Sequence, residues 1–227
     1  MTGANFVRTR ENMQEFSGMA RVVKSLRKGT VLMGPITDNR FRFRAGDIAT
    51  RVKKLDIVSL RGQRVFDLTA VGASAIGQGL ELNAGSLLTS RFLGVQTAVL
   101  NGSRNGVTLS IDPFDATVMV IPGIGATHFR NFVAINSVSA YQYDAIQGYY
   151  GADADADGIG SVVYGAFTSI TDVAVGGQAL VANLPGGVVP TASTGVFCWA
   201  GIEFYQQIGI QYYRLFLNDA GRVVLLG

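Results

Sequence analysis

Three aspartates near the middle of the chain have the clearest spacing for chemistry. Asp153, Asp155 and Asp157 alternate with alanine, and Gly158 follows them. Carboxylates at alternate positions can converge on one hard cation, and the glycine permits the sharp turn. The pattern matches the first half of a calcium loop, but Tyr164 stands where a bidentate glutamate is expected. Calcium is therefore a candidate ligand, and a solvated acidic loop tip is the alternative.

Other catalytic patterns are absent or incomplete. His128 is the only histidine and Cys198 the only cysteine, which leaves almost no zinc or haem site and excludes a disulfide framework. No G-x-S-x-G elbow occurs, and two isolated G-x-G pairs do not continue into a phosphate loop. We predict that the chain is not an enzyme and needs no cofactor. The alternative is an enzyme that uses His128 or the Asp153–Asp157 carboxylates.

Basic residues are concentrated in the first quarter of the chain. Residues 1–64 contain fourteen Lys or Arg against five Asp or Glu, whereas residues 65–227 contain five against eleven. The segment 40–44 alternates arginine with phenylalanine, which predicts a strand with a basic face. Such a face could contact nucleic acid phosphates, but pairing with the acidic remainder of a neighbouring copy is the favoured interpretation. The predicted basic residues are Arg40, Arg42, Arg44, Arg51, Lys53 and Lys54.

The composition favours a protein that is covered by other subunits. Only 15% of the residues are charged, where a soluble domain has about 25%. Hydrophobic residues make up 48%, and the mean hydropathy is positive. A free monomer needs a charged surface to remain soluble, and this chain supplies only a thin one. Eight tyrosines suit subunit interfaces, and they would also suit sugar binding.

Hydrophobic periodicity predicts one helix followed by many short strands. Residues 9–28 carry Met13, Phe16, Ala20 and Val23 at helical spacing, a stripe typical of a core or a subunit contact. Turn signals at 101–106 and 218–221 predict two β-hairpins. Strands are predicted at 40–44, 55–60, 65–71, 80–88, 94–100, 107–111, 117–121, 129–143, 161–170, 179–184, 196–205, 211–217 and 222–226.

These elements predict a mainly β protein, an antiparallel β-sandwich or barrel with an N-terminal helical arm. The expected organisation is a basic helical arm over residues 1–30 and an all-β domain over residues 31–227. The N-terminal residues contain no apolar segment typical of a secretory signal, so we expect synthesis in the cytoplasm. No apolar run approaches the length of a membrane span, and no membrane partner is expected.

Composition and organisation together resemble those of virion structural proteins of tailed bacteriophages, such as capsid, decoration, tail or neck components. The resemblance rests on low charge, few Cys and His, Gly-rich turns between strands and the basic arm. It implies a self-assembling structural protein located in a virion, with copies of itself and other subunits as partners. The alternative is a carbohydrate- or receptor-binding β module of a fibre or adhesin.

Overall fold

The computed structural model describes residues 6–152 and 156–227. Strands account for 35% of the residues and helices for 28%, and every strand pair is antiparallel. The prediction of a mainly β fold with an N-terminal helix is therefore confirmed. The arrangement is sandwich-like, with no closed barrel among the described residues.

Two long strands form the centre of the larger sheet. β3 (His128–Ser139) and β9 (Thr194–Ile208) pair along their full common length. Two short strands follow one another along the free edge of each long strand. These are β6 (Gly160–Tyr164) and β7 (Thr168–Ser169) beside β3, and β10 (Gln211–Arg214) and β11 (Ala220–Leu226) beside β9.

A smaller sheet and a separate hairpin complete the β structure. β1 (Gln96–Leu100) and β2 (Gly106–Ile111) form a hairpin through the 101–106 turn, as predicted. β8 (Gln178–Asn183) pairs with β2 and completes the three-stranded sheet. β4 (Tyr141–Asp144) and β5 (Tyr149–Ala152) form the second hairpin.

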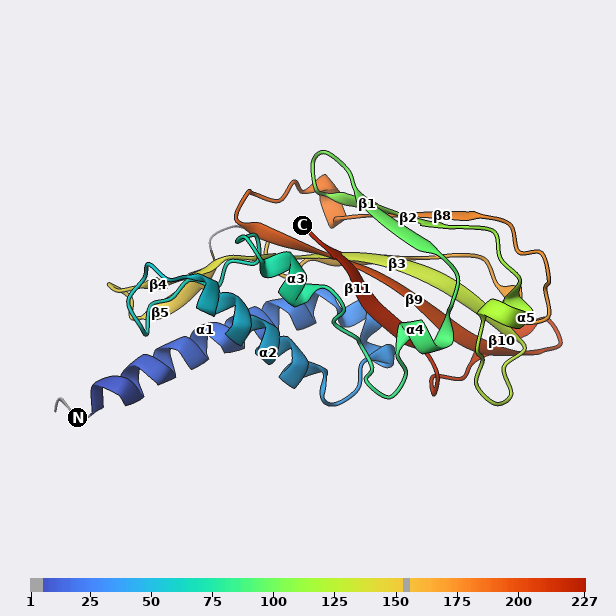
Figure 1. Ribbon diagram of the computed structural model, residues 1–227, viewed down its shortest axis with the longest axis horizontal. Helices are drawn as coiled ribbons and strands as arrows, with labels where there is room; N and C mark the ends of the chain where they lie inside the picture. Colours follow the sequence, from blue (N-terminus) through green and yellow to red (C-terminus); the bar gives the residue numbers. More distant parts are fainter. Residues whose placement is uncertain (1–5, 153–155) are drawn as a thin grey trace.

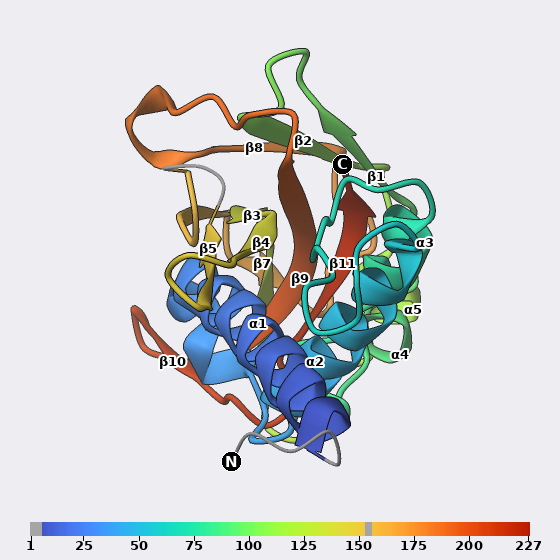
Figure 2. The same cartoon turned by 90° about the vertical axis from the view of Figure 1, so that its left-hand side faces the viewer.

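Alternation along the long strands divides the interior into two cores. Val133, Ile135 and Cys198 belong to the core beneath the smaller sheet. Phe132 and Trp199 point to the opposite face and belong to the core beneath the helices. The molecule therefore has three layers, with the small sheet, the large sheet and the helices stacked in that order (Figure 2).

Helix α1 (Val7–Gly29) lies along the large sheet and begins at one end of the molecule (Figure 1). Three of its six buried residues are Gly or Ser, and at the two glycines a neighbouring side chain lies too close to leave room for a Cβ atom. A Cβ atom at Gly18 would lie 2.4 Å from the Phe66 ring, and one at Gly29 would lie 2.7 Å from Asn136. Part of the predicted stripe points outward, since Met13 and Phe16 are exposed.

The predicted strand at 40–44 is wrong, because this segment opens helix α2 (Phe41–Val52). Phe41, Ala45, Ile48 and Val52 recur at helical spacing and are all buried, so a helical stripe extends beyond the short alternation. The basic side chains consequently do not share one strand face. Two 3₁₀ segments flank the helix, η2 (Val31–Ile36) and η3 (Lys53–Leu55).

The strands predicted at 55–60, 65–71, 80–88 and 117–121 are also wrong. Aspartates at the start of three of these segments accept hydrogen bonds from nearby amides and so favour local turns over strand pairing. Asp56 accepts from the Val58 and Ser59 amides, and Asp115 accepts from the Thr117 amide. Short helices occur instead, namely α3 (Ala73–Gly77), α4 (Leu88–Arg91), α5 (Ala116–Met119) and η4 (Pro185–Gly187).

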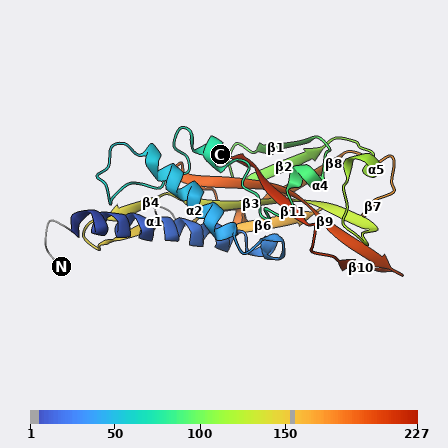
Figure 3. The ribbon, with the colours of Figure 1, turned by 60° about the horizontal axis from the view of Figure 1, so that its bottom comes forward.

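The hairpin predicted at 218–221 is wrong as well. β10 and β11 do not pair with each other, since both pair with β9 and follow one another along its edge (Figure 3). Asp219 lies in the irregular segment between them and accepts a hydrogen bond from the Phe204 amide of β9 at 2.8 Å. The Asp219 carboxylate thus accepts the hydrogen bond of a β9 amide at the point where the strand paired with β9 changes from β11 to β10.

Candidate functional site

The densest cluster of buried charge centres on Glu203 of β9. The Glu203 side chain is fully buried, with Arg130 of β3 on one side and Arg214 of β10 on the other. Arg130 Nη2 lies 2.8 Å from Oε2, and Arg214 Nη2 lies 2.7 Å from Oε1. The Tyr205 hydroxyl donates to Oε2 at 2.6 Å. Burial and this carboxylate together raise the pKa of Tyr205, so the hydroxyl remains a donor.

Asp219 extends the cluster to the segment that precedes β11. Its carboxylate is fully buried and accepts a hydrogen bond from Arg214 Nε at 2.7 Å. Burial raises the pKa of Asp219, against the opposing effects of the Phe204 amide and the Arg214 guanidinium. Burial alone would lower the pKa of Arg214, but the two carboxylates raise it. Two carboxylates therefore balance two guanidiniums inside the protein.

Aromatic rings enclose this ion-pair network. The Arg130 guanidinium lies 3.7 Å from the centroid of the Tyr164 ring. The Phe167 and Tyr212 rings stack with centroids 4.0 Å apart, and the His128 ring meets the Tyr212 ring edge-on at 5.0 Å. An enclosed network of paired charges of this kind fixes β3, β9 and β10 relative to one another. Its geometry supports a structural role rather than general acid–base chemistry.

The sequence predictions did not include the residues of this network. One signal was present, because Arg130 and Glu203 are the only charged residues of the predicted strands at 129–143 and 196–205. Charged residues are almost never fully buried unless they are paired. Their pairing could not be inferred, since it depends on the register that places Arg130 opposite Glu203.

The six predicted basic residues divide between internal pairs and the surface. Arg44 donates to both carboxylate oxygens of Asp38 and to the Glu81 and Leu82 carbonyls. Lys53 Nζ lies 2.6 Å from the buried Glu15 carboxylate. Both side chains thus stabilise the fold. The other four predicted residues are exposed, namely Arg40, Arg42, Arg51 and Lys54.

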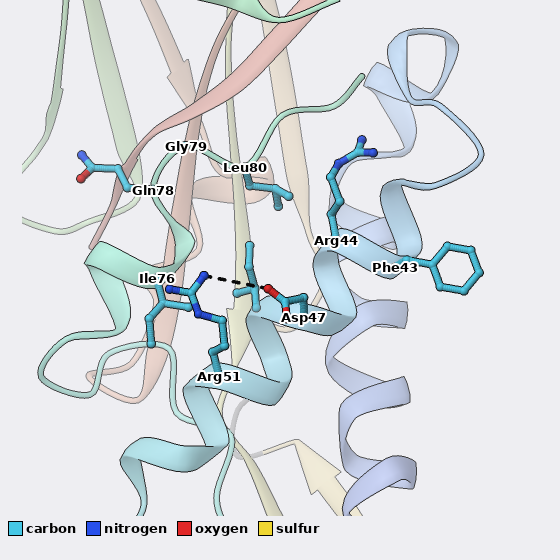
Figure 4. A pocket seen from close by; sticks show the side chains of 9 residues that line it. Phe43, Arg44, Asp47, Arg51, Ile76, Gln78, Gly79 and Leu80 are labelled. Carbon is cyan, nitrogen blue, oxygen red and sulfur yellow. Dashed lines mark ion pairs between the residues drawn. The ribbon is translucent and has the colours of Figure 1, made fainter. Parts of the chain in front are cut away.

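An open groove of about 500 Å³ runs along α2 and contains two of the predicted basic residues (Figure 4). Arg51 pairs loosely with Asp47 at 3.9 Å, and the two side chains point toward each other. Ile76 and Leu80 supply an apolar side. None of the buried polar atoms that lack a hydrogen-bond partner in the described part of the chain belongs to this groove. The groove therefore offers no built ligand site.

The predicted calcium site is only partly within the described residues. Asp153 and Asp155 lie outside them. Asp157 accepts hydrogen bonds from the Ser25 hydroxyl at 2.6 Å, the Ser139 amide at 3.0 Å and the Tyr141 hydroxyl at 2.5 Å. Its carboxylate thus already has three protein donors and connects α1 to the large sheet. Among residues 6–152 and 156–227, no group of three or more His, Cys, Asp or Glu could hold a metal.

Exposed apolar side chains gather where α1 begins, on what we call the helix-end surface. The loop after η3 packs on the first half of α1, since Arg61 Nη2 donates to Asn12 Oδ1 at 2.9 Å and the Gly62 amide donates to Glu15 Oε1 at 3.0 Å. The exposed apolar members of the helix-end surface are Phe6, Val7, Met13, Phe16, Ile57, Val58 and Leu60.

A second such group lies around the turn between β9 and β10, on what we call the hairpin-end surface. Backbone hydrogen bonds join three segments there: the Thr127 amide donates to the Tyr205 carbonyl at 2.9 Å, and the Ile170 amide donates to the Thr127 carbonyl at 3.1 Å. Ile124 and Ile210 are almost fully exposed. The exposed apolar members of the hairpin-end surface are Val118, Ile121, Ile124, Val173, Ile208 and Ile210.

Comparisons with known proteins give no assignment. No protein-family model, curated protein or solved structure matches the chain. In the described part of the chain, no helix combines the length and the apolar character needed to span a membrane.

Proposed function

We propose that the chain is a non-enzymatic structural subunit that assembles with copies of itself. The exposed apolar side chains of the helix-end and hairpin-end surfaces are the observation that supports this proposal. Apolar patches on monomeric proteins rarely exceed a few hundred Å², and larger ones mark interaction sites. Burying apolar surface contributes roughly 25 cal/mol per Å², so contacts between copies would stabilise an assembly.

The size of the protein in solution tests this proposal. Sedimentation velocity over a concentration series is expected to show species heavier than the 24.1 kDa chain, with a fraction that rises with concentration. A single monomeric species at high concentration would contradict the proposed function, whatever the contact between copies.

We further propose that the assembly is a virion of a tailed bacteriophage, in which the chain is a capsid, decoration, tail or neck component. The composition and the many Gly-turned strands support this identity. Electron microscopy of the purified chain is expected to show closed rings, tubes or shells. Small, irregular aggregates without repeated geometry would argue against a virion component.

Nucleic acid is a second partner proposed for the basic part of the chain. Arg40 and Lys54 are exposed, and no ion pair joins either side chain to a carboxylate among the described residues. Phosphate contacts of this kind weaken steeply with salt. Weaker DNA binding at low salt by a variant with Arg40→Gln and Lys54→Gln would support nucleic acid as a partner. Equal DNA binding by the parent protein and this variant would show that the two residues do not contact the nucleic acid.

A carbohydrate- or receptor-binding module is the alternative function. Exposed tyrosines at β10 favour it, because Tyr213 is half exposed and Tyr212 lies beside it. However, the Tyr212 ring already contacts Phe167 and His128, which leaves less of its face for a sugar. Binding to a glycan array that is lost in a Tyr213→Ala variant would favour this alternative over assembly.

A further inference from the structure

We propose that copies of the chain join head to tail, with the helix-end surface of one copy docked on the hairpin-end surface of the next. The inference rests on the proposed self-assembly and specifies the contact that makes it. Three observations carry it: the positions of the two surfaces, their apolar side chains and their opposite charge.

The two surfaces lie at opposite ends of the longest axis of the molecule. α1 begins at one end, and the β9–β10 turn, α5 and the segments around them lie at the other (Figures 1 and 3). An apolar group at each end allows one copy to contact two neighbours at once. The end-to-end arrangement therefore repeats without requiring a third surface.

The helix-end surface has a basic excess. Residues 6–16 and 53–64, which form the first half of α1 and the segment packed on it, contain six Lys or Arg. Three acidic residues accompany them. Glu11 pairs with Arg8 and Arg61, Glu15 is buried against Lys53, and Asp56 accepts three backbone amides of its own loop. The six basic residues outnumber the three acidic ones, so this end carries a net positive charge of three.

The hairpin-end surface has the opposite charge. Residues 112–127, 167–177 and 206–213, which form this end, contain no Lys or Arg. They contain three aspartates, of which Asp112 and Asp172 are exposed and Asp115 is partly exposed. The nearby guanidiniums of Arg130 and Arg214 are already paired with Glu203 and Asp219. The surface is therefore apolar with an acidic rim.

Charge complementarity selects a head-to-tail contact over a symmetric one. Two helix-end surfaces brought together would place like positive charges opposite one another, and two hairpin-end surfaces would do the same with negative charges. Like charges at an interface are costly, whereas a basic surface facing an acidic one is favourable and guides association. A head-to-tail contact is heterologous, so it closes into a ring or continues as a filament.

Two variants, one for each end, test the contact. The helix-end variant carries Met13→Gln and Phe16→Gln, and the hairpin-end variant carries Ile208→Thr and Ile210→Ser. All four side chains are exposed, so both variants are expected to fold and to melt like the parent protein. A matched control carries Val99→Thr and Val181→Thr, which removes two exposed apolar side chains from the outer face of the small sheet, between the ends.

Mixing distinguishes the geometry of the contact. Each end variant alone is expected to sediment as a monomer, while the control assembles like the parent protein. A mixture of the two end variants retains one intact pair of surfaces, so it is expected to form a one-to-one dimer and nothing larger.

The possible results separate the inference from the proposed function. If the parent protein assembles but the mixture remains monomeric, or if either end variant still assembles fully, the head-to-tail contact is wrong and self-assembly stands. If the parent protein is itself a monomer, the proposed function fails and the contact fails with it.

Discussion

Glu203 is the residue whose environment departs most from that of an ordinary surface carboxylate. It is fully buried in β9, and its charge is balanced by two guanidiniums from neighbouring strands. Removing one member of a buried ion pair leaves the others desolvated without compensation. The cost of such a change exceeds the net stability that the complete network provides.

We therefore expect Glu203→Gln to lower the free energy of unfolding by about 3 kcal/mol. The physical reason is that Arg130 loses its carboxylate partner and Arg214 retains only Asp219. Urea denaturation at neutral pH measures the change. Asp112→Asn, at an exposed carboxylate, is the control and is expected to change stability by less than about 0.5 kcal/mol. Equal effects of the two substitutions would show that the network is not an essential stabilising element.

Asp56 predicts a defined dependence of stability on pH. Partial burial would raise its pKa, but the amides of Ser59, Val65 and Val58 lower the pKa from 3.8 to about 2. A lowered pKa in the folded state stabilises the protein above the unfolded pKa, and this contribution is lost as the pH falls from 3.8 to 2. We expect Asp56→Asn to cost about 1 kcal/mol at pH 7 and almost nothing at pH 2.

Urea denaturation across this pH range tests the Asp56 prediction. Asp47→Asn is the matched control, because the Asp47 side chain is 67% exposed and its ion pair with Arg51 is long. A difference between parent and Asp56→Asn that does not shrink in acid would mean that the carboxylate is not the group responsible.

Calcium is expected to leave the stability unchanged. Asp157 already accepts hydrogen bonds from Ser25, Ser139 and Tyr141, so little of the acceptor capacity of its carboxylate remains for a cation. We expect the same melting temperature in excess chelator and in millimolar calcium. A rise of several degrees in calcium would instead support the site predicted from Asp153, Asp155 and Asp157.

At the scale of elements, the close approach of α1 to the β4–β5 hairpin and to the segment that contains Phe66 depends on a glycine. Gly18 faces the rings of Phe66 and Tyr150, and both rings are buried. Such contacts fix the depth at which the helix lies. Because the interior is close-packed, an added methyl group at this position requires the neighbouring rings to move.

Two glycines in neighbouring helices form a matched pair for testing this packing. A Cβ atom at Gly18 of α1 would lie 2.4 Å from Phe66, whereas one at Gly46 of α2 would lie 3.6 Å from Met19, an ordinary contact. We expect Gly18→Ala to destabilise the protein by about 1–3 kcal/mol through overpacking. Gly46→Ala is expected to stabilise it by up to about 1 kcal/mol through helix propensity. Thermal unfolding of both variants measures the two effects, and the same sign for both would refute the packing argument.

At the scale of the whole molecule, the distribution of charge has a direct consequence for assembly. Fourteen of the nineteen Lys and Arg precede residue 65, and six of them lie in the first half of α1 and the segment packed on it. Salt screens such charges over about 10 Å at 0.1 M. An electrostatically guided contact between copies must therefore weaken as the salt concentration rises.

We expect the apparent association constant of the parent protein to fall about tenfold or more between 50 and 500 mM sodium chloride. Sedimentation at fixed protein concentration provides the measurement. Association that is insensitive to salt, or that strengthens with it, would show that apolar burial alone holds the copies together.

The sequence predicted the N-terminal helix and most of the strands after residue 94 correctly, but it predicted strands between residues 31 and 93, where the structure has helices and irregular segments. The hairpin around the 101–106 turn was predicted correctly, because its two strands are adjacent in the sequence and the turn residues between them mark it locally. The Arg-Phe alternation at 40–44 failed because it was too short to outweigh the helical stripe that continues to Val52. The strands predicted at 55–60 and 65–71 failed because Asp56 and Asp67 capture nearby amides.

The sequence by itself determined the class of fold and the uneven distribution of charge, because both follow from local periodicity and from composition along the chain. The tertiary structure decided which charges are used within the fold and which remain at the surface. Arg44, Lys53 and Glu203 acquire their partners only when distant segments meet. Likewise, only the folded chain places a basic and an acidic apolar surface at opposite ends, since that separation depends on how α1 lies along two long strands.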